Sequence, residues 1–141
     1  MELQSTNGLT QQEFDAFFSD HIPDFNQAEM KKYGYFLYQE HSPTAFFSLV
    51  PVDSNAYWLR MLVMKKSPTI TLPVTIIQAA EKLTQSYGAT NLFIHSKTEN
   101  LNQLLVQLGY KSANKALDPE IKADWWITSL ESVDKKATYS Q

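Results

Sequence analysis

Residues 34–64 hold three runs rich in aromatic and branched apolar side chains. Two short polar segments separate the runs, His41-Ser42-Pro43 and Asp53-Ser54-Asn55. These residue types favour turns, so the pattern predicts an antiparallel meander of three strands. The third run, Tyr57 to Met64, is nearly all apolar apart from Arg60, which is typical of a strand covered on both faces.

Helical segments are expected before the meander. Thr10 can accept a hydrogen bond from a first-turn amide, and Glu13 can reach back to the Thr10 amide, which is the pattern of a capping box. Pro23 stops this helix, and a short helical or turn segment follows over residues 26–32. Apolar side chains at helical spacing predict a core face made of Phe14, Phe17, Phe18 and Ile22.

A longer helix is expected after the meander. Pro73 suits its first position, because proline has no amide hydrogen and the first amides of a helix have no intrahelical partner. Gly88 suits its end, because glycine tolerates a left-handed backbone. The expected inward face consists of Ile76, Ile77, Ala80, Leu83 and Tyr87.

A buried strand over residues 91–95, a second helix and a last strand over residues 124–130 complete the pattern. The helix begins either with a capping box of Ser96 and Glu99 or with Thr98 as its N-cap, and it ends at Gly109. A polar loop precedes the last strand. The inward leucines of the helix are Leu101, Leu104, Leu105 and Leu108.

Length and charge limit the domain count and the class of partner. A chain of 141 residues with 43% hydrophobic content can bury one core, so we expect a single domain over residues 1–131 and a solvated tail over residues 132–141. Twelve basic and fifteen acidic residues give a net charge of −3, and the lysine pairs are scattered. We therefore expect no binding to nucleic acid.

Residue types also exclude several kinds of site. The chain has no cysteine, which excludes disulfides, thiolate metal ligands and a cysteine nucleophile. Its three histidines lack the spacing of metal ligands, so we expect no metal. No apolar run approaches the roughly 20 residues of a membrane helix, and the first ten residues lack the features of a signal peptide. We expect a soluble, cytoplasmic protein without membrane contact.

The order of these elements resembles a domain of the GCN5-related N-acetyltransferase (GNAT) family. In that family a strand enters a phosphate loop and a long helix, and a buried strand, a helix and a leucine-glycine-aromatic signature follow. Residues 60–80 and 91–111 show this order here, and Leu108-Gly109-Tyr110 matches the signature. The resemblance implies an α+β fold with a mostly antiparallel mixed sheet, helices on both faces and a splayed central strand pair.

The resemblance also implies a site for acetyl-CoA or another acyl-CoA. The pantetheine arm would pair with backbone groups at the end of the strand Tyr57 to Met64, and the pyrophosphate would rest on the start of the next helix. Thr98, or Asn100 after a small shift, matches an asparagine that the family often has at the start of its later helix. The cofactor-binding residues implied are Leu62, Val63, Met64, Lys66, Thr69, Ile70, Thr71 and Thr98.

The phosphate loop departs from the family's pattern of Arg or Gln, Gly, x, Gly, x, Gly or Ala. The matching residues 68–73 read Pro-Thr-Ile-Thr-Leu-Pro, so every signature position differs. Both prolines lack an amide donor, and both threonines bring branched side chains to where phosphate would approach. The hydroxyl and ammonium groups of residues 65–71 can still attract an anion, although Lys65 and Lys66 alternatively form an ordinary exposed strand end.

Catalysis in the family needs a base for the acceptor amine and an acid for the leaving thiolate. Leu105 stands four residues before the glycine, where the family commonly has a tyrosine acid, and it cannot donate a proton. We take His95 as the candidate catalytic residue, because an ordinary imidazole titrates near neutrality and this one ends the second strand of the splayed pair. Glu40 and His41 are further candidates.

Two functions are compatible with these features. The first is a divergent N-acyltransferase with a degenerate phosphate loop, whose partners are an acyl-CoA and an amine. The second is a non-catalytic GNAT-like module that binds an unknown protein partner, and a homodimer is compatible with either. A surface for such a partner would use some of the aromatic residues Tyr33, Tyr35, Tyr57, Trp58, Trp125 and Trp126.

Overall fold

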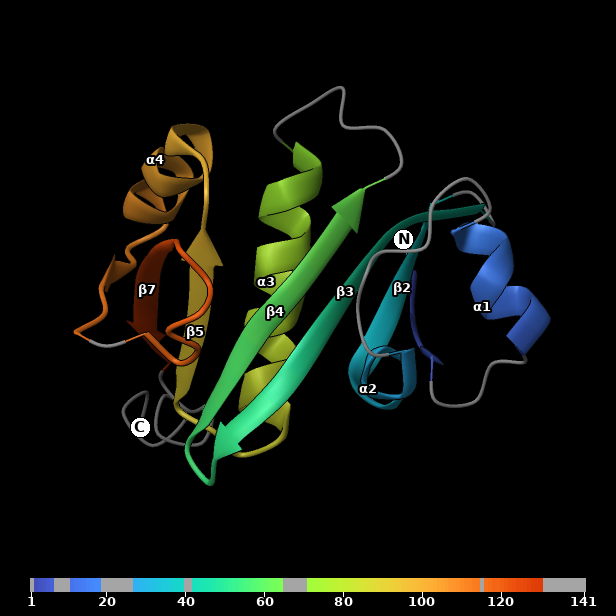
Figure 1. Ribbon diagram of the computed structural model, residues 1–141, viewed down its shortest axis with the longest axis horizontal. Coiled ribbons are helices and arrows are strands. Elements are labelled where there is room, and N and C mark those ends of the chain that lie inside the picture. The colour runs from blue at the N-terminus through green and yellow to red at the C-terminus, as the bar shows by residue number, and fades with distance from the viewer. Residues whose placement is uncertain are drawn as a thin grey trace, which may run out of the picture. The chain divides into compact units, whose positions relative to one another are not determined.

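The structure, a computed structural model, describes residues 2–6, 11–18, 27–39, 42–64, 71–114 and 116–130. Its strands belong to one mixed sheet of the order β1-β2-β3-β4-β5-β7-β6, in which β4 and β5 are parallel and the other described pairs are antiparallel. The predicted α+β class with a mixed, mostly antiparallel sheet is confirmed (Figure 1). The elements are β1 (Glu2–Ser5), α1 (Gln11–Phe17), α2 (Gln27–Tyr33), β2 (Gly34–Gln39), β3 (Ser42–Asp53), β4 (Ala56–Met64), α3 (Thr71–Ser86), β5 (Asn91–Ser96), α4 (Glu99–Gln107), β6 (Lys111–Ser112) and β7 (Asp124–Ser129).

The chain divides into two compact units. Unit 1 comprises Met1–Leu49 and Met61–Ile70, and unit 2 comprises Val50–Arg60 and Thr71–Gln141. Each unit has its own cluster of buried apolar side chains.

An aromatic cluster forms the core of unit 1. Phe17 and Phe18, which the helical spacing predicts as core residues, are buried against Phe36 of β2 and Phe46 of β3. The ring centroids of Phe18 and Phe46 lie 5.4 Å apart, and the ring planes are inclined at 73°. Aromatic pairs prefer this edge-to-face arrangement. The predicted Phe14 side chain and Ile22 lie outside the described residues.

Gly34 joins α2 to β2 where the backbone packs closely. A Cβ atom at this position would overlap the carbonyl oxygen of Met30 and lie 2.5 Å from Cε1 of Phe46. Because the carbonyl belongs to the backbone, it cannot rotate away as a side chain could. Only glycine therefore fits at this junction without a shift of its neighbours.

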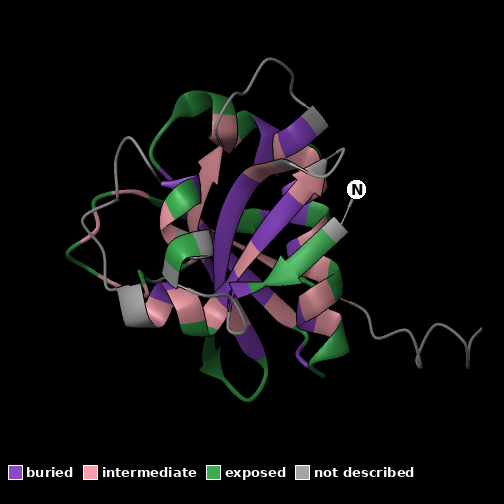
Figure 2. Ribbon diagram, turned by 90° about the vertical axis from the view of Figure 1, so that its right-hand side faces the viewer, coloured by how far each residue is buried: buried purple, intermediate pink, exposed green. Residues whose placement is uncertain are grey.

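The sequence pattern gives no sign of β1. This strand pairs with β2 from Glu2↔Tyr38 to Ser5↔Tyr35, yet its one apolar residue, Leu3, is 39% exposed, and the strand is drawn as exposed in Figure 2. The buried hydroxyl of Thr6 donates to the carbonyl oxygens of Met30 at 3.1 Å and Lys31 at 2.7 Å. Backbone pairing and this hydroxyl hold the segment, and neither produces an alternating apolar pattern.

In unit 2, α3 begins two residues before Pro73, and not at Pro73 as the sequence suggests. Proline is tolerated throughout the first turn, because none of the first four amides has an intrahelical partner. The predicted inward residues Ile76, Ile77 and Ala80 are fully buried. Tyr87 was expected inward and is instead 47% exposed, because it lies beyond the last helical residue, Ser86.

Both helices of unit 2 end as the sequence predicts. Gly88 and Gly109 adopt φ values of 84° and 92°, the left-handed backbone that glycine permits. At the start of α4, Thr98 is the N-cap, and its Oγ1 accepts a hydrogen bond from the Leu101 amide at 3.2 Å. The alternative capping box at Ser96 is wrong, because the Ser96 hydroxyl donates to the Thr98 carbonyl.

Candidate functional site

The parallel strands β4 and β5 pair only at their starts. Their register runs from Ala56↔Asn91 to Leu59↔Ile94, whereas β4 continues to Met64 and β5 to Ser96. On its other side β5 stays paired with β7 as far as Ser96↔Asp124. This early end of the parallel pairing confirms the predicted splayed strand pair.

The structure describes part of the predicted cofactor site. Leu62, Val63 and Met64 are the half-buried last residues of β4, and Val63 packs against the aromatic cluster of unit 1. Thr98 uses its side-chain oxygen to cap α4. The remaining predicted positions, Lys66, Thr69, Ile70 and the side chain of Thr71, lie outside the described residues, as do Glu40 and His41.

His95 lies within a cluster of aromatic rings in unit 2. Its Nδ1 accepts a hydrogen bond from Nε1 of Trp58 at 3.0 Å. Its ring centroid is 5.5 Å from that of Trp58 and 5.2 Å from that of Trp125, the residue opposite it on β7. These residues come from three strands, β4, β5 and β7, so the bond between the indole and the imidazole could not be read from spacing along the sequence.

The surroundings of His95 disfavour its charged form. Its pKa is lowered from 6.5 to about 4, first by burial and then by the positive charges of Lys97 and Arg60, while Asp118 raises it. Arg60 also lies over the Trp58 ring, with its Cζ 4.9 Å from the ring centroid. His95 is therefore a neutral imidazole at pH 7, and not the group of ordinary pKa that the sequence suggests.

Stability should respond to this shifted pKa. The unfolded chain takes up a proton on His95 near its ordinary pKa of 6.5, whereas the folded chain does so only near 4. The free energy of unfolding should therefore fall as the pH drops from 6.5 towards 4, and the contribution of His95 is complete above 6.5. His95→Asn should reduce the loss of unfolding free energy between pH 7 and pH 5, as measured by urea denaturation. An unchanged loss in this variant would contradict the assignment.

Two of the six aromatic residues considered for a binding surface belong to the core of unit 2, and the other four are partly buried. Trp58 and Trp125 are 5% and 7% exposed and form a buried cluster with Phe93. The indole Nε1 of Trp126 donates to Oδ1 of Asn102 at 3.0 Å. Tyr35 stacks on Phe47, with centroids 5.4 Å apart. These contacts explain four of the six aromatic residues by packing or hydrogen bonding within the chain.

Leu105, at the position of the family's tyrosine, is fully buried in α4. The nearby Tyr110 hydroxyl donates to Oε2 of Glu81 on α3 at 2.8 Å. Burial and the Glu81 carboxylate raise the pKa of Tyr110 above its ordinary value, so this phenol keeps its proton. The Tyr110 hydroxyl thus links two segments of unit 2 and is committed to a structural bond.

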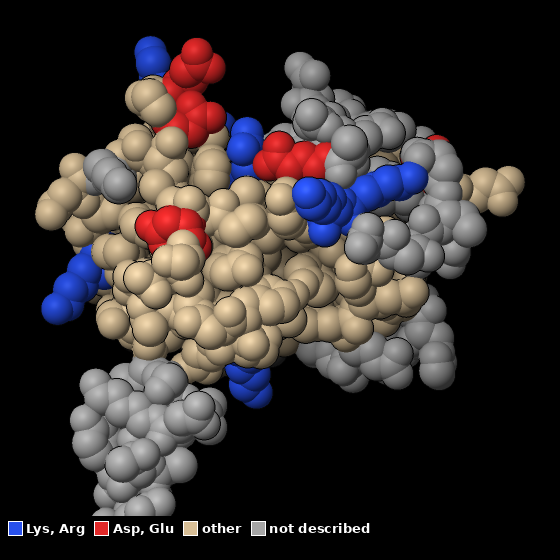
Figure 3. All heavy atoms as spheres, turned by 90° about the horizontal axis from the view of Figure 1, so that it is seen from below, with Lys and Arg blue, Asp and Glu red and all other residues tan. Residues whose placement is uncertain are grey.

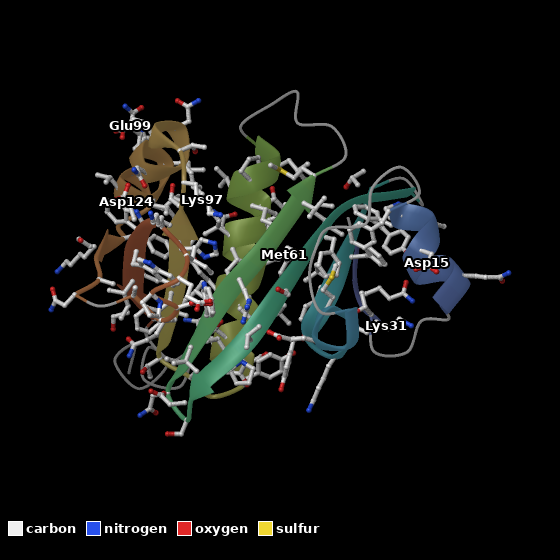
Figure 4. All side chains as sticks on the ribbon, viewed as in Figure 1. Asp15, Lys31, Met61, Lys97, Glu99 and Asp124 are labelled. Carbon is white, nitrogen blue, oxygen red and sulfur yellow. The ribbon has the colours of Figure 1, made fainter. Side chains whose placement is uncertain are left out.

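Other surface features of the described residues give no stronger site. They contain no group of three His, Asp or Glu side chains placed to hold a metal ion. None of the described helices has the length and apolar character for crossing a membrane. On the face drawn in Figure 3, the described charged side chains are scattered among uncharged ones. A shallow open hollow is lined by residues of α4 and β7, among them Glu99 and Asp124, which are labelled in Figure 4. Trp126 also lines it, but none of the predicted catalytic or cofactor-binding residues does.

No protein-family model and no curated protein sequence matches the chain. Solved structures match its fold. N-acetylglutamate synthase from Neisseria gonorrhoeae, complexed with coenzyme A and N-acetyl-glutamate, has a TM-score of 0.69 at 8% identity, over 92% of this chain and 35% of that one. A GNAT-family acetyltransferase from Listeria monocytogenes 4b F2365 has a TM-score of 0.63 at 18% identity, over 87% and 78%. Ard1 from Thermoplasma volcanium has a TM-score of 0.68 at 9% identity, over 93% and 98%.

These likenesses define the fold. The chain spans about a third of the Neisseria synthase and most of the other two proteins. At such low identities, agreement in the order and placement of elements is evidence of architecture and not of activity. The protein has the fold of GNAT acetyltransferases, as the sequence resemblance predicts.

Proposed function

We propose that this protein binds acetyl-CoA or another acyl-CoA and transfers the acyl group to an amine. The observation that carries the proposal is the GNAT fold, which it shares with a Neisseria synthase complexed with coenzyme A. The end of β4 supplies backbone at Leu62, Val63 and Met64 beyond the residues that pair with β5. In the proposed complex this backbone pairs with the pantetheine arm.

The proposed phosphate site uses side chains in place of glycine amides. The ammonium group of Lys66 and the hydroxyls of Thr69 and Thr71 would bind the pyrophosphate, with the backbone amide of Ile70 between them. Thr98 would contact the cofactor while its side-chain oxygen continues to cap α4. This degenerate loop should bind more weakly than a glycine-rich one, because branched side chains keep phosphate farther from the backbone.

A non-catalytic GNAT-like module is the second candidate, and the burial of Leu105 favours it. A fully buried leucine replaces the family's acid, so the thiolate would need another proton source. Such a module would bind a protein partner or a second copy of the chain. Under both proposals the protein acts in the cytoplasm as one functional domain over residues 1–131, with residues 132–141 as a tail.

Calorimetry and thermal denaturation test the cofactor proposal together. Acetyl-CoA should bind with measurable heat and should stabilise the folded chain, because a ligand that binds only the folded state adds RT ln(1 + [L]/Kd) to the free energy of unfolding. The gain is about 2.7 kcal/mol at a ligand concentration about 100 times Kd. Absence of both effects at millimolar acetyl-CoA would overturn the proposal, and binding without turnover of any amine would favour the non-catalytic module.

A charge variant locates the phosphate site. Thr71→Glu places a carboxylate at the first residue of α3 and should abolish the stabilisation by acetyl-CoA, because like charges repel. Gln78→Glu adds the same charge at an exposed position of the same helix and should leave it unchanged. If Thr71→Glu and the unmodified protein bound acetyl-CoA with equal affinity, this turn would not be the phosphate site.

A further inference from the structure

The hydrogen bond between Trp58 and His95 decides which ring nitrogen of the imidazole carries its proton. An indole N–H can donate but cannot accept. The 3.0 Å bond from Nε1 of Trp58 to Nδ1 of His95 therefore requires a lone pair, and no proton, on Nδ1. A neutral imidazole has one N–H, which then lies on Nε2.

Neither nitrogen of His95 is then available as a base. The lone pair of Nδ1 accepts the indole N–H, and Nε2 holds the proton and so has no lone pair to offer. A general base needs a lone pair within reach of the proton that it removes. Before His95 takes up a proton on Nδ1, the bond to Trp58 has to break.

The packing of unit 2 keeps the imidazole in this orientation. The buried rings of Trp58 on β4 and Trp125 on β7 contact His95 from the two strands that neighbour β5. A flipped imidazole would set a carbon atom, Cδ2, opposite the indole N–H. That donor of a buried side chain would lose its acceptor, which is unfavourable. The observed orientation is therefore the one that satisfies Trp58.

The surroundings of His95 keep it in the neutral form that this argument requires. Burial disfavours the imidazolium, as do the positive charges of Lys97, directly after β5 (Figure 4), and of Arg60 on β4. Asp118, in the segment between β6 and β7, acts in the opposite direction, and the pKa of His95 is nevertheless lowered to about 4. A single proton on Nε2 is thus expected at pH 7.

We propose that Trp58 is a positioning residue that holds His95 in the Nε2–H form and thereby keeps it from serving as the base of the proposed acyl transfer. The inference rests on the proposed function only in naming that reaction. The amine nitrogen, already neutral, bonds to the acyl carbon, the carbon–sulfur bond breaks, and the proton released by the nitrogen reaches the thiolate through solvent. His95 gains no proton in this sequence.

Nitrogen NMR of the unmodified protein at pH 7 tests the proposal. A scalar correlation across the hydrogen bond should join Nε1 of Trp58 to Nδ1 of His95. The Nε2–H form should make up at least about 90% of His95, because one hydrogen bond favours a form about 10-fold. Absence of the correlation, or a larger share of the Nδ1–H form, would overturn the proposal.

Two tryptophan variants separate the hydrogen bond from the packing of the rings. Trp58→Phe keeps an aromatic ring but removes the donor, and it should raise the ratio of the Nδ1–H form to the Nε2–H form of His95 about 10-fold. Trp125→Phe is the matched control, because Trp125 contacts His95 through its ring alone, and it should leave the ratio unchanged. Equal changes in both variants would contradict the role of Trp58.

The same spectra are recorded with and without acetyl-CoA. The Nε2–H form should persist in both, and a proton on Nδ1 in the presence of acetyl-CoA would overturn the proposal. The protein alone already decides whether Trp58 sets the proton, even if a tryptophan variant does not fold. Failure of acyl-CoA binding and failure of this inference are therefore distinguishable.

Discussion

Gly34→Ala should lower the free energy of unfolding by about 3 kcal/mol or more, a loss at the upper end of those seen for single substitutions. The added methyl group would overlap the Met30 carbonyl oxygen and press on the Phe46 ring. Phe46 is itself fully buried in the aromatic cluster of unit 1, so neither neighbour has space to move into. Urea denaturation followed by circular dichroism measures the loss.

Gly88→Ala is the matched control for that variant. No atom lies within 4 Å of a Cβ added at Gly88, so the only cost is its φ of 84°. A left-handed residue with a side chain costs about 1 kcal/mol. Similar losses for the two variants would show that strain of the backbone, and not the close packing at Gly34, decides the result.

Leu105→Ala should cost about 2 to 5 kcal/mol, because it removes most of a fully buried side chain and leaves a cavity. Val106→Ala, at the next position of α4, should change stability by less than about 0.5 kcal/mol, because Val106 is 57% exposed. Denaturant titration of both variants measures the difference. If the two losses were equal, Leu105 would not be the core residue that its burial indicates.

The same position tests the proposed loss of the family's acid. Leu105→Tyr restores the tyrosine, but the larger ring should be overpacked and should cost about 1 to 3 kcal/mol. We expect no increase in the rate of acyl transfer. A stable Leu105→Tyr variant with faster transfer would show that the site still accepts the family's chemistry.

The elements with strong local signals could be predicted from the sequence. The turn residues at Asp53–Asn55 and the glycines at 88 and 109 mark positions where backbone geometry restricts the residue type, and the structure has turns or helix ends at each. Pro73 predicts a start of α3 that is two residues too late, because proline fits several positions of a first helical turn equally well. β1 could not be predicted, because backbone groups and the Thr6 hydroxyl hold it.

The candidate site was less predictable than the fold. His95 could be selected by residue type and by its place at the end of a strand, but its properties depend on partners distant in the chain. Trp58 lies 37 residues away and is its hydrogen-bond donor. Lys97, Arg60 and Asp118 act on it from three different segments. No local pattern encodes such a neighbourhood, so the lowered pKa of His95 emerges only in the folded chain.

β1 also determines which strand edge the described sheet leaves open beside β2. It covers the edge of β2, a strand that includes the buried Phe36 and Leu37 and whose backbone groups could otherwise pair with a strand of another chain. The outer edge that β1 presents instead is only four residues long, with Leu3, Gln4 and Ser5 exposed. Very short edge strands are poor templates for strand addition. We therefore expect removal of β1 to uncover the edge of β2 for pairing with another chain.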